Sequence, residues 1–277
     1  MYQKVKSNLR SLVVFIAVNL LFIATTHAQQ NRGLITDIVL EKSSSGNEFP
    51  IVNAAKVAAS LRYDVNDFKG VIRAVGDLKN DINSVTSVMP GLLTTEASTE
   101  YEIIVGTLGK NKLIDQLVKA KKIDVSELKG KWDSFVITTI ENPQPGTKKS
   151  LVIVGSDKRG TIFGIYELSQ QLGVSPWYWW ADVPAKQRQS AYVLPGRYAS
   201  GEPKVKFRGL FINDEAPCLT SWVKNTYGTD HGDHRFYARV FELILRLKGN
   251  YLWPAMWGWA FYADDPMNSK VADEMGV

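Results

Sequence analysis

Residues 151–169 carry the sequence Leu-Val-Ile-Val-Gly-Ser-Asp-Lys-Arg-Gly-Thr-Ile-Phe-Gly-Ile-Tyr-Glu-Leu-Ser. The first five residues form a short apolar run closed by a glycine, which is typical of a strand buried inside a sheet. From Ile162 to Leu168 the apolar residues recur at helical spacing, and Gly173 is suited to end that helix. A buried strand joined by a short turn to a helix is the repeating unit of α/β folds, so this stretch predicts that class.

The turn inside this stretch, residues 155–160, has the position of a phosphate-binding loop. Its sequence, Gly-Ser-Asp-Lys-Arg-Gly, matches neither the Walker pattern nor G-x-G-x-x-G. We therefore interpret it as a tight strand-to-helix connection in which the Asp157 side chain caps the helix.

Neighbouring segments repeat the strand-helix pattern. Residues 101–106 predict a strand ending at a glycine, followed by a short amphipathic helix with lysines in its last turn. Residues 49–89 change from extended to helical spacing, with Asn66 as the predicted N-cap between the two parts. Residues 135–140 alternate as a further strand. Together these units predict an α/β accessory domain over residues 29–200.

A second domain is predicted over residues 201–277. Residues 191–203 contain Pro, Gly and Ser and follow neither period, so we expect them to connect the two domains. Residues 205–212 then read as a strand, residues 235–248 as an amphipathic helix, and residues 250–253 as the next strand.

This β-α-β unit has polar and aromatic residues after each strand, where (β/α)8 enzymes place their chemistry. A complete barrel of this kind takes about 250 residues. Only 77 residues follow residue 200. We therefore expect the truncated start of a (β/α)8 TIM barrel that does not close within this sequence.

Asn213, Asp214 and Glu215 follow the first predicted strand of this unit. Adjacent side chains of an extended chain point to opposite sides, so one carboxylate can face a pocket. There it can act as a general acid, as a base or as an acceptor for sugar hydroxyls. The alternative is that Asp214 caps the following turn and Glu215 is solvated.

Tryptophan is concentrated in the second half of the chain. Aromatic rings stack on the C–H faces of sugars, which favours a carbohydrate pocket, whereas burial at a domain interface is the alternative for the first three. The residues are Trp177, Trp179, Trp180, Trp222, Trp253, Trp257 and Trp259.

Two further groups of residues have a functional and a structural interpretation. His231 and His234 stand beside Asp230 and Asp233, but they lack the spacing of zinc sites, and we predict a solvated loop and no metal. The single cysteine, Cys218, excludes an internal disulfide and is interpreted as a small apolar filler.

Residues 1–28 have the features of a secretory signal. A basic start precedes an apolar run and the small-residue site that ends at Ala28, after which we predict cleavage. The run is too short to span a bilayer, so an uncleaved membrane anchor is the less favoured alternative. The protein is therefore expected to be secreted or periplasmic, with no membrane segment after cleavage. Without Lys4, Lys6 and Arg10 of this segment, the net charge falls from +5 to 5 − 3 = +2. So small a charge, and the lack of a Lys/Arg cluster with interleaved aromatics, argue against nucleic-acid binding.

Four strings of residues resemble glycoside hydrolase family 115: 151–169, 173–184, 207–217 and 247–258. The resemblance implies an enzyme that removes α-1,2-linked glucuronic acid or its 4-O-methyl ether from xylan with inversion and without a cofactor. It implies glucuronoxylan as the partner and leaves the oligomeric state open.

The resemblance assigns roles to residues after the two strands of the barrel. Asp214 and Glu215 become catalytic candidates, and Asn213 a pocket residue. The second-strand segment supplies four residues predicted to contact substrate: Asn250, Trp253, Met256 and Trp257.

Three functions remain under consideration at this point. An inverting pair of carboxyls stands about 6.5–9.5 Å apart, so adjacent residues are not expected to supply both, and the chain alone is predicted to be inactive. One alternative is a non-catalytic carbohydrate-binding or accessory module made as a short natural product. The other is a hexosaminidase-like glycosidase, since an α/β domain ahead of a barrel also fits that class.

Overall fold

The structure is a computed structural model that describes residues 37–277 except 96, 214–215 and 255. The predicted signal at 1–28 and the candidates Asp214 and Glu215 lie outside the described residues. Among the described residues no helix combines the length and apolarity needed to cross a membrane.

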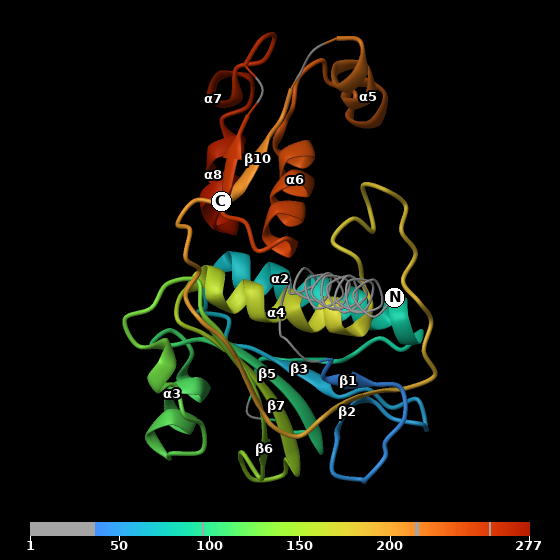
Figure 1. Cartoon of the computed structure of the whole chain (residues 1–277), viewed down its shortest axis with the longest axis vertical. Helices are drawn as coiled ribbons and strands as arrows, with labels where there is room; N and C mark the ends of the chain where they lie inside the picture. The colour runs from blue at the N-terminus through green and yellow to red at the C-terminus, as the bar shows by residue number, and fades with distance from the viewer. Residues whose placement is uncertain (1–36, 96, 214–215, 255) are drawn as a thin grey trace, which may run out of the picture. The chain divides into compact units, whose positions relative to one another are not determined.

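A six-stranded mixed sheet organises the first part of the chain, in the order β4-β3-β5-β7-β6-β9 (Figure 1). Strands β4, β3, β5 and β7 run parallel, β6 is antiparallel to β7, and β9 is antiparallel to β6. The strands are β3 (Ser60–Arg62), β4 (Leu92–Leu93), β5 (Tyr101–Thr107), β6 (Phe135–Glu141), β7 (Lys149–Gly155) and β9 (Arg197–Ser200).

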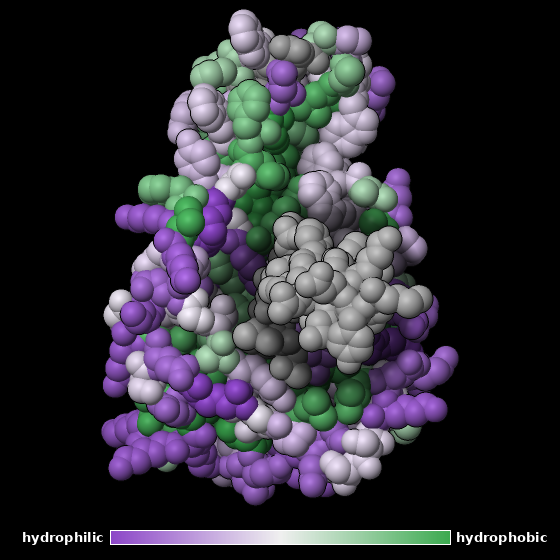
Figure 2. Space-filling model, in the orientation of Figure 1, coloured by the Kyte–Doolittle hydropathy of each residue, from purple (hydrophilic) through white to green (hydrophobic). Residues whose placement is uncertain are grey.

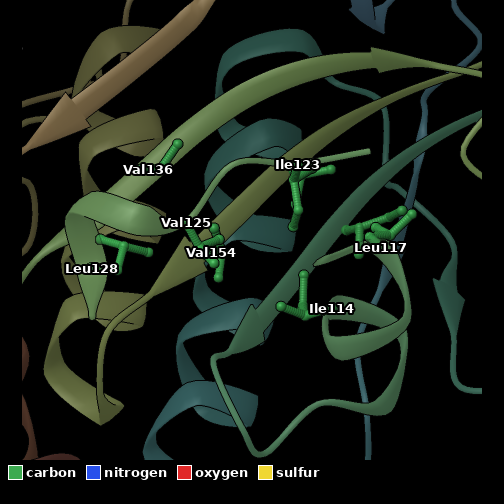
Figure 3. Close-up of a cluster of buried hydrophobic side chains, with 9 residues drawn as sticks. Ile114, Leu117, Ile123, Val125, Leu128, Val136 and Val154 are labelled. Carbon is green, nitrogen blue, oxygen red and sulfur yellow. The ribbon is translucent and has the colours of Figure 1, made fainter. Parts of the chain in front are cut away.

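Helices pack on both faces of this sheet. On one face α2 (Lys69–Thr86) and α4 (Lys158–Leu172) pack against each other, and Gly164 of α4 lies against Ile153 and Phe135 of the sheet. On the other face α3 (Lys112–Lys119) and the 3-10 helix η1 (Ser126–Leu128) enclose a hydrophobic cluster with β5, β6 and β7 (Figure 3). Its members are Ile104, Ile114, Leu117, Ile123, Val125, Leu128, Val136, Val152 and Val154.

The connection from β7 to α4 confirms the interpretation of residues 155–160. The Asp157 side chain accepts a hydrogen bond from the Gly160 N–H at 2.7 Å and so caps the helix. A Cβ on Gly155 would overlap the backbone of Thr161, and one on Gly160 would overlap the Ser134 carbonyl oxygen. The two glycines therefore permit a close approach of strand and helix that no larger residue allows.

Two expectations for the first domain are wrong. Helix α2 has Phe68 as its N-cap, without a side-chain cap, and Asn66 lies two residues before it, where its amide donates to the Asp64 carboxylate at 3.0 Å. Residues 191–203 are not simply a connection, since they contain β9 and also β8 (Ala191–Val193). Strand β8 lies between β1 (Val39–Leu40) and β2 (Phe49–Val52) in an antiparallel sheet.

The second part of the chain confirms the predicted β-α-β unit. Strands β10 (Gly209–Phe211) and β11 (Tyr251–Trp253) are parallel, and α6 (His234–Arg246) lies between them in sequence. Strand β10 is shorter than the predicted 205–212. The remaining helices are α5 (Cys218–Tyr227), α7 (Phe261–Asp264) and α8 (Met267–Met275).

A buried ion-pair network joins α6 to α2. The guanidinium of Arg246 binds both carboxylate oxygens of Asp81, at 2.9 and 3.1 Å, and its Nε donates to Glu242 at 2.9 Å. Glu242 also accepts from the Tyr178 hydroxyl at 2.9 Å. Burial, and then the nearby Glu242 charge, raise the pKa of Tyr178 to about 12, so this hydroxyl remains a donor. The rings of Tyr166 and Tyr178 lie 4.5 and 4.8 Å from the Arg246 guanidinium.

Candidate functional site

The carboxyl ends of β10 and β11 lie next to each other. The parallel register pairs Leu210 with Leu252 and Phe211 with Trp253, and the Ile212 N–H donates to the Trp253 carbonyl oxygen at 3.0 Å. The segment that begins with Asn213 and the segment that begins with Pro254 therefore leave the sheet at the same edge.

Exposed aromatic side chains mark this edge. Phe211 and Trp253 are 55% and 51% exposed, and their rings meet edge to face with centroids 5.5 Å apart. Leu210 and Leu252, on the opposite face by strand alternation, are half-buried. Figure 2 shows an apolar band on the surface of the part of the chain that holds β10 and α6. An exposed aromatic surface suits the stacking of sugar rings.

The predicted residues after the strands share this exposure. Asn213 is exposed, and Met256 and Trp257 are 62% and 78% exposed in the segment after β11. The structure thus brings Asn213 and Trp253 to neighbouring strand ends and places Met256 and Trp257 in the adjoining segment. The roles of Asp214 and Glu215 between β10 and α5 stay predictions, since both lie outside the described residues.

Asn250 lies at the other, amino-terminal end of β11 and is buried. Its side chain donates to Asp133 at 3.2 Å and to the Lys206 carbonyl at 2.8 Å, and it accepts from the Arg208 N–H at 3.0 Å. Asp133 in turn pairs with Arg208 at 2.9 Å and with Arg159 of α4 at 2.6 Å. This set of contacts, the Asp133 clamp, fixes the amino ends of β10 and β11 to the first sheet. Sequence reasoning missed Asp133, which no motif marks.

The histidine-containing loop ahead of α6 is used for capping. Asp233 accepts from the N–H groups of Arg235 and Phe236 at 3.0 and 3.2 Å and pairs with the Arg235 side chain. Burial raises the pKa of Asp233, but the bonds from Arg235 and the backbone outweigh it, so the pKa lies below its usual value. His231 contacts Asp230 at 3.2 Å. Within the described part of the chain, no three His, Cys, Asp or Glu side chains are grouped as metal ligands.

His234, the first residue of α6, is tied to the segment before α8. The Asp265 carboxylate accepts from the His234 backbone N–H at 2.9 Å, lies 2.7 Å from His234 Nδ1, and accepts from the Met267 N–H at 2.9 Å. The first of these bonds is the main cause that lowers the pKa of Asp265 to about 2. The Asp265 carboxylate therefore makes contacts in the folded state that depend on its negative charge.

Asp265→Asn is expected to lower the Tm near neutral pH, and the difference from wild type should shrink as the pH falls from about 4 to about 2. Because folding lowers this pKa from 3.8, the carboxylate stabilises the fold above that value and loses its contribution as the pH falls through the folded pKa. Thermal unfolding followed by circular dichroism over pH 2–7 measures it. The exposed Asp273→Asn is the control, and a Tm difference independent of pH contradicts the expectation.

The tryptophans at 177–180 contact the helices of the second part. The ring of Trp180 lies 5.7 Å from Trp222 of α5 and 6.1 Å from Phe236 of α6, and its N–H donates to the Arg239 carbonyl at 3.3 Å. This agrees with the interface interpretation for Trp180. Trp177 remains 44% exposed. Cys218 is exposed at the start of α5, so its interpretation as a filler is wrong.

Comparison with known proteins finds a matching family and similar solved structures. Residues 200–277 match the family described as Glycosyl hydrolase family 115. The chain is similar to the structure described as a novel family GH115 4-O-methyl-α-glucuronidase, BtGH115A, with specificity for decorated arabinogalactans, at 33% identity and a TM-score of 0.67. That match covers 80% of this chain and 28% of BtGH115A, so the chain spans well under half of its relative.

Two further solved structures match over much of the chain at low similarity. One is a mutant Streptomyces plicatus β-hexosaminidase with its product GlcNAc, at 12% identity and a TM-score of 0.43, covering 75% of this chain and 31% of that one. The other is CpGH84D, at 8% identity and a TM-score of 0.43, covering 87% and 40%. Curated proteins give no match.

Proposed function

Because the chain belongs to glycosyl hydrolase family 115, we propose that residues 205–253 are the first β-α-β unit of a catalytic (β/α)8 barrel. The observation that carries this proposal is the parallel, in-register pairing of β10 and β11. It brings the segments after both strands to one edge, which is where barrels of this kind hold substrate.

The proposed reaction is hydrolysis of the α-1,2 bond that links glucuronic acid, or its 4-O-methyl ether, to xylan, with inversion and without a cofactor. Inversion needs one carboxyl that protonates the leaving oxygen and one that activates water on the opposite face. Asp214 or Glu215 supplies one of the two. Trp253, Met256 and Trp257 offer apolar surface to the sugar, and Asn213 offers an amide.

The chain alone is proposed to be inactive. Two residues adjacent in sequence do not span the roughly 6.5–9.5 Å between the carboxyls of an inverting pair, so the second carboxyl must come from another strand end. In the described residues β10 and β11 are the two strands of this sheet. Purified residues 29–277 should therefore release no free uronic acid from glucuronoxylan, and measurable release contradicts the proposal.

The test of the reaction uses a version of the protein extended to include the remaining barrel strands. Its incubation with 4-O-methylglucuronoxylan should release the uronic acid first as the β-anomer, which proton NMR detects before mutarotation. If Asp214 or Glu215 is the acid or base, Asp214→Asn or Glu215→Gln should lower kcat by about 10²–10⁴-fold. Asp230→Asn, an exposed carboxylate in the same connection, is the matched control and should leave kcat unchanged.

The polymer and the linkage are tested together. BtGH115A is described as specific for decorated arabinogalactans, so an arabinogalactan bearing 4-O-methylglucuronic acid is assayed beside glucuronoxylan. Release of N-acetylhexosamine from N-acetylhexosaminides, with no uronic acid from either polymer, overturns the proposal in favour of a hexosaminidase-like enzyme. Tight polymer binding without any release favours a non-catalytic module.

We also propose that the protein is exported, on the sequence of residues 1–28. Expression of the full chain in a bacterial host followed by N-terminal sequencing of the exported product should give Gln29 as the first residue. A product that keeps Met1 and stays in the membrane fraction contradicts the cleavage.

A further inference from the structure

A crevice lies at the carboxyl ends of β3 and β5, on the α3 side of the six-stranded sheet. Its volume is about 460 Å³, within the roughly 300–1,000 Å³ of pockets that hold small ligands. Residues after β3, after β4 and in α3 line it, among them Tyr63, Asp64, Thr94, Lys112 and Gln116. None of these residues belongs to the site at β10 and β11.

The topology of the sheet accounts for this crevice. From β3 the chain continues through α2 to β4 on one side, and from β5 it continues through α3 to β6 and β7 on the other side. The two connecting helices cover opposite faces, so the chain diverges between β3 and β5. Crevices outside the carboxyl ends of strands at such a switch point are where open α/β sheets bind ligands.

Three of the charged side chains around the crevice, those of Arg62, Asp64 and Glu102, already have partners within the protein. Arg62 binds Glu102 at 2.6 Å, and Glu102 also accepts from Gln144 at 3.1 Å. Asp64 accepts from the N–H of Lys112, the first residue of α3, at 3.3 Å and from the Asn66 N–H at 2.9 Å. The Asp64 carboxylate already occupies the amino end of α3. We therefore expect no second anion to bind at that helix end.

The groups that line the rest of the crevice are those that bind neutral sugars. Thr94 supplies a hydroxyl, Gln116 and Gln144 supply amides, and the half-buried Tyr63 supplies an aromatic ring. A second hollow of about 750 Å³ shares Leu113 with it, as well as the two glutamines, and extends along the loop at 142–148. The two hollows together have room for more than one sugar unit.

We propose that this crevice binds a neutral, hydroxyl-rich oligosaccharide, as a subsite on the first domain for the backbone of the polysaccharide. The proposal rests on the proposed function for the choice of a polysaccharide, while the crevice itself is independent of β10 and β11. The first domain would then bind the polysaccharide at a site separate from the ends of β10 and β11, where hydrolysis is proposed.

The test is a titration of the full chain, ¹⁵N-labelled, with linear xylohexaose. We expect saturable amide shifts at residues 63–66, 112–116 and 144. Thr94→Trp, at an exposed position, fills the crevice and should weaken the dissociation constant at least about tenfold. Tyr63→Ala should weaken it about fivefold, as expected for one lost stacking contact. Asn80→Trp, exposed on α2, is the matched control and should bind as wild type does.

Further measurements distinguish a failure of this proposal from a failure of the proposed function. Trp257→Ala should leave the shifts at residues 63–66 unchanged, because that side chain belongs to the other site. The proposal is overturned if Thr94→Trp binds normally, if no saturable shift occurs in the crevice, or if linear hexagalacturonate binds there more tightly than xylohexaose. Failure of the hydrolysis assay on the longer protein leaves the crevice titration unaffected, so the two can fail independently.

Discussion

Arg246→Met is expected to lower the free energy of unfolding by about 3–5 kcal/mol. The Arg246 side chain is 3% exposed, and its partners Asp81 and Glu242 are 6% and 4% exposed. Removing the guanidinium leaves two buried carboxylates without their main cation, and the desolvation of those charges is then uncompensated. Urea unfolding followed by circular dichroism measures the change.

The same substitution at Arg235 is the control, because it lies in the same helix with its side chain 51% exposed. Arg235→Met should cost less than about 1 kcal/mol. Adding Asp81→Asn to Arg246→Met should recover part of the loss, since it removes one unpaired charge. Equal effects of Arg246→Met and Arg235→Met would show that the buried network does not stabilise the fold.

Gly160→Ala is expected to be the second large loss, of about 3 kcal/mol. An added Cβ would overlap the Ser134 carbonyl oxygen, which is backbone and cannot rotate away as a side chain can. Either α4 must move off the sheet or the turn after β7 must open, and both disturb the core beneath. The midpoint of urea unfolding measures the effect.

Gly76→Ala is the matched control for this substitution. Gly76 lies in α2, and nothing stands within 4 Å of a Cβ built there. The helix gains from the replacement of glycine, so Gly76→Ala should stabilise the protein by about 0.5–1 kcal/mol. If Gly160→Ala lowers the free energy of unfolding and Gly76→Ala raises it, the loss at Gly160 comes from the contact with Ser134 and not from the added methyl group itself. A Gly160→Ala variant as stable as wild type would contradict this.

The fold could be predicted where its determinants are local in the sequence. The apolar run at 151–154, the cap at Asp157 and the glycine at 173 all act within a few residues, and each is found as expected. The prediction of Asn66 as the N-cap was wrong because the helix begins only at Lys69, with Phe68 before it as the cap. The prediction that residues 191–203 only connect the two domains was wrong because β8 and β9 are short strands whose partners are distant in sequence.

In the candidate site, too, features with local determinants could be predicted and features that depend on distant partners could not. The pairing of strand ends at Phe211 and Trp253 follows from the β-α-β pattern, so it could be predicted. The burial of Asn250 could not, because its partner Asp133 is 117 residues away. Arg246 and Asp81 are 165 residues apart, and no periodicity or motif connects residues at such a separation.

The Asp133 clamp acts at the amino ends of β10 and β11, whereas the segments that begin with Asn213 and Pro254 leave from the carboxyl ends. Under the proposed function, anchorage and substrate binding are therefore assigned to opposite ends of the same two strands. On that proposal, loops grafted after Phe211 or Trp253 would alter substrate choice, while the contacts of Asp133 at the amino ends would stay unchanged.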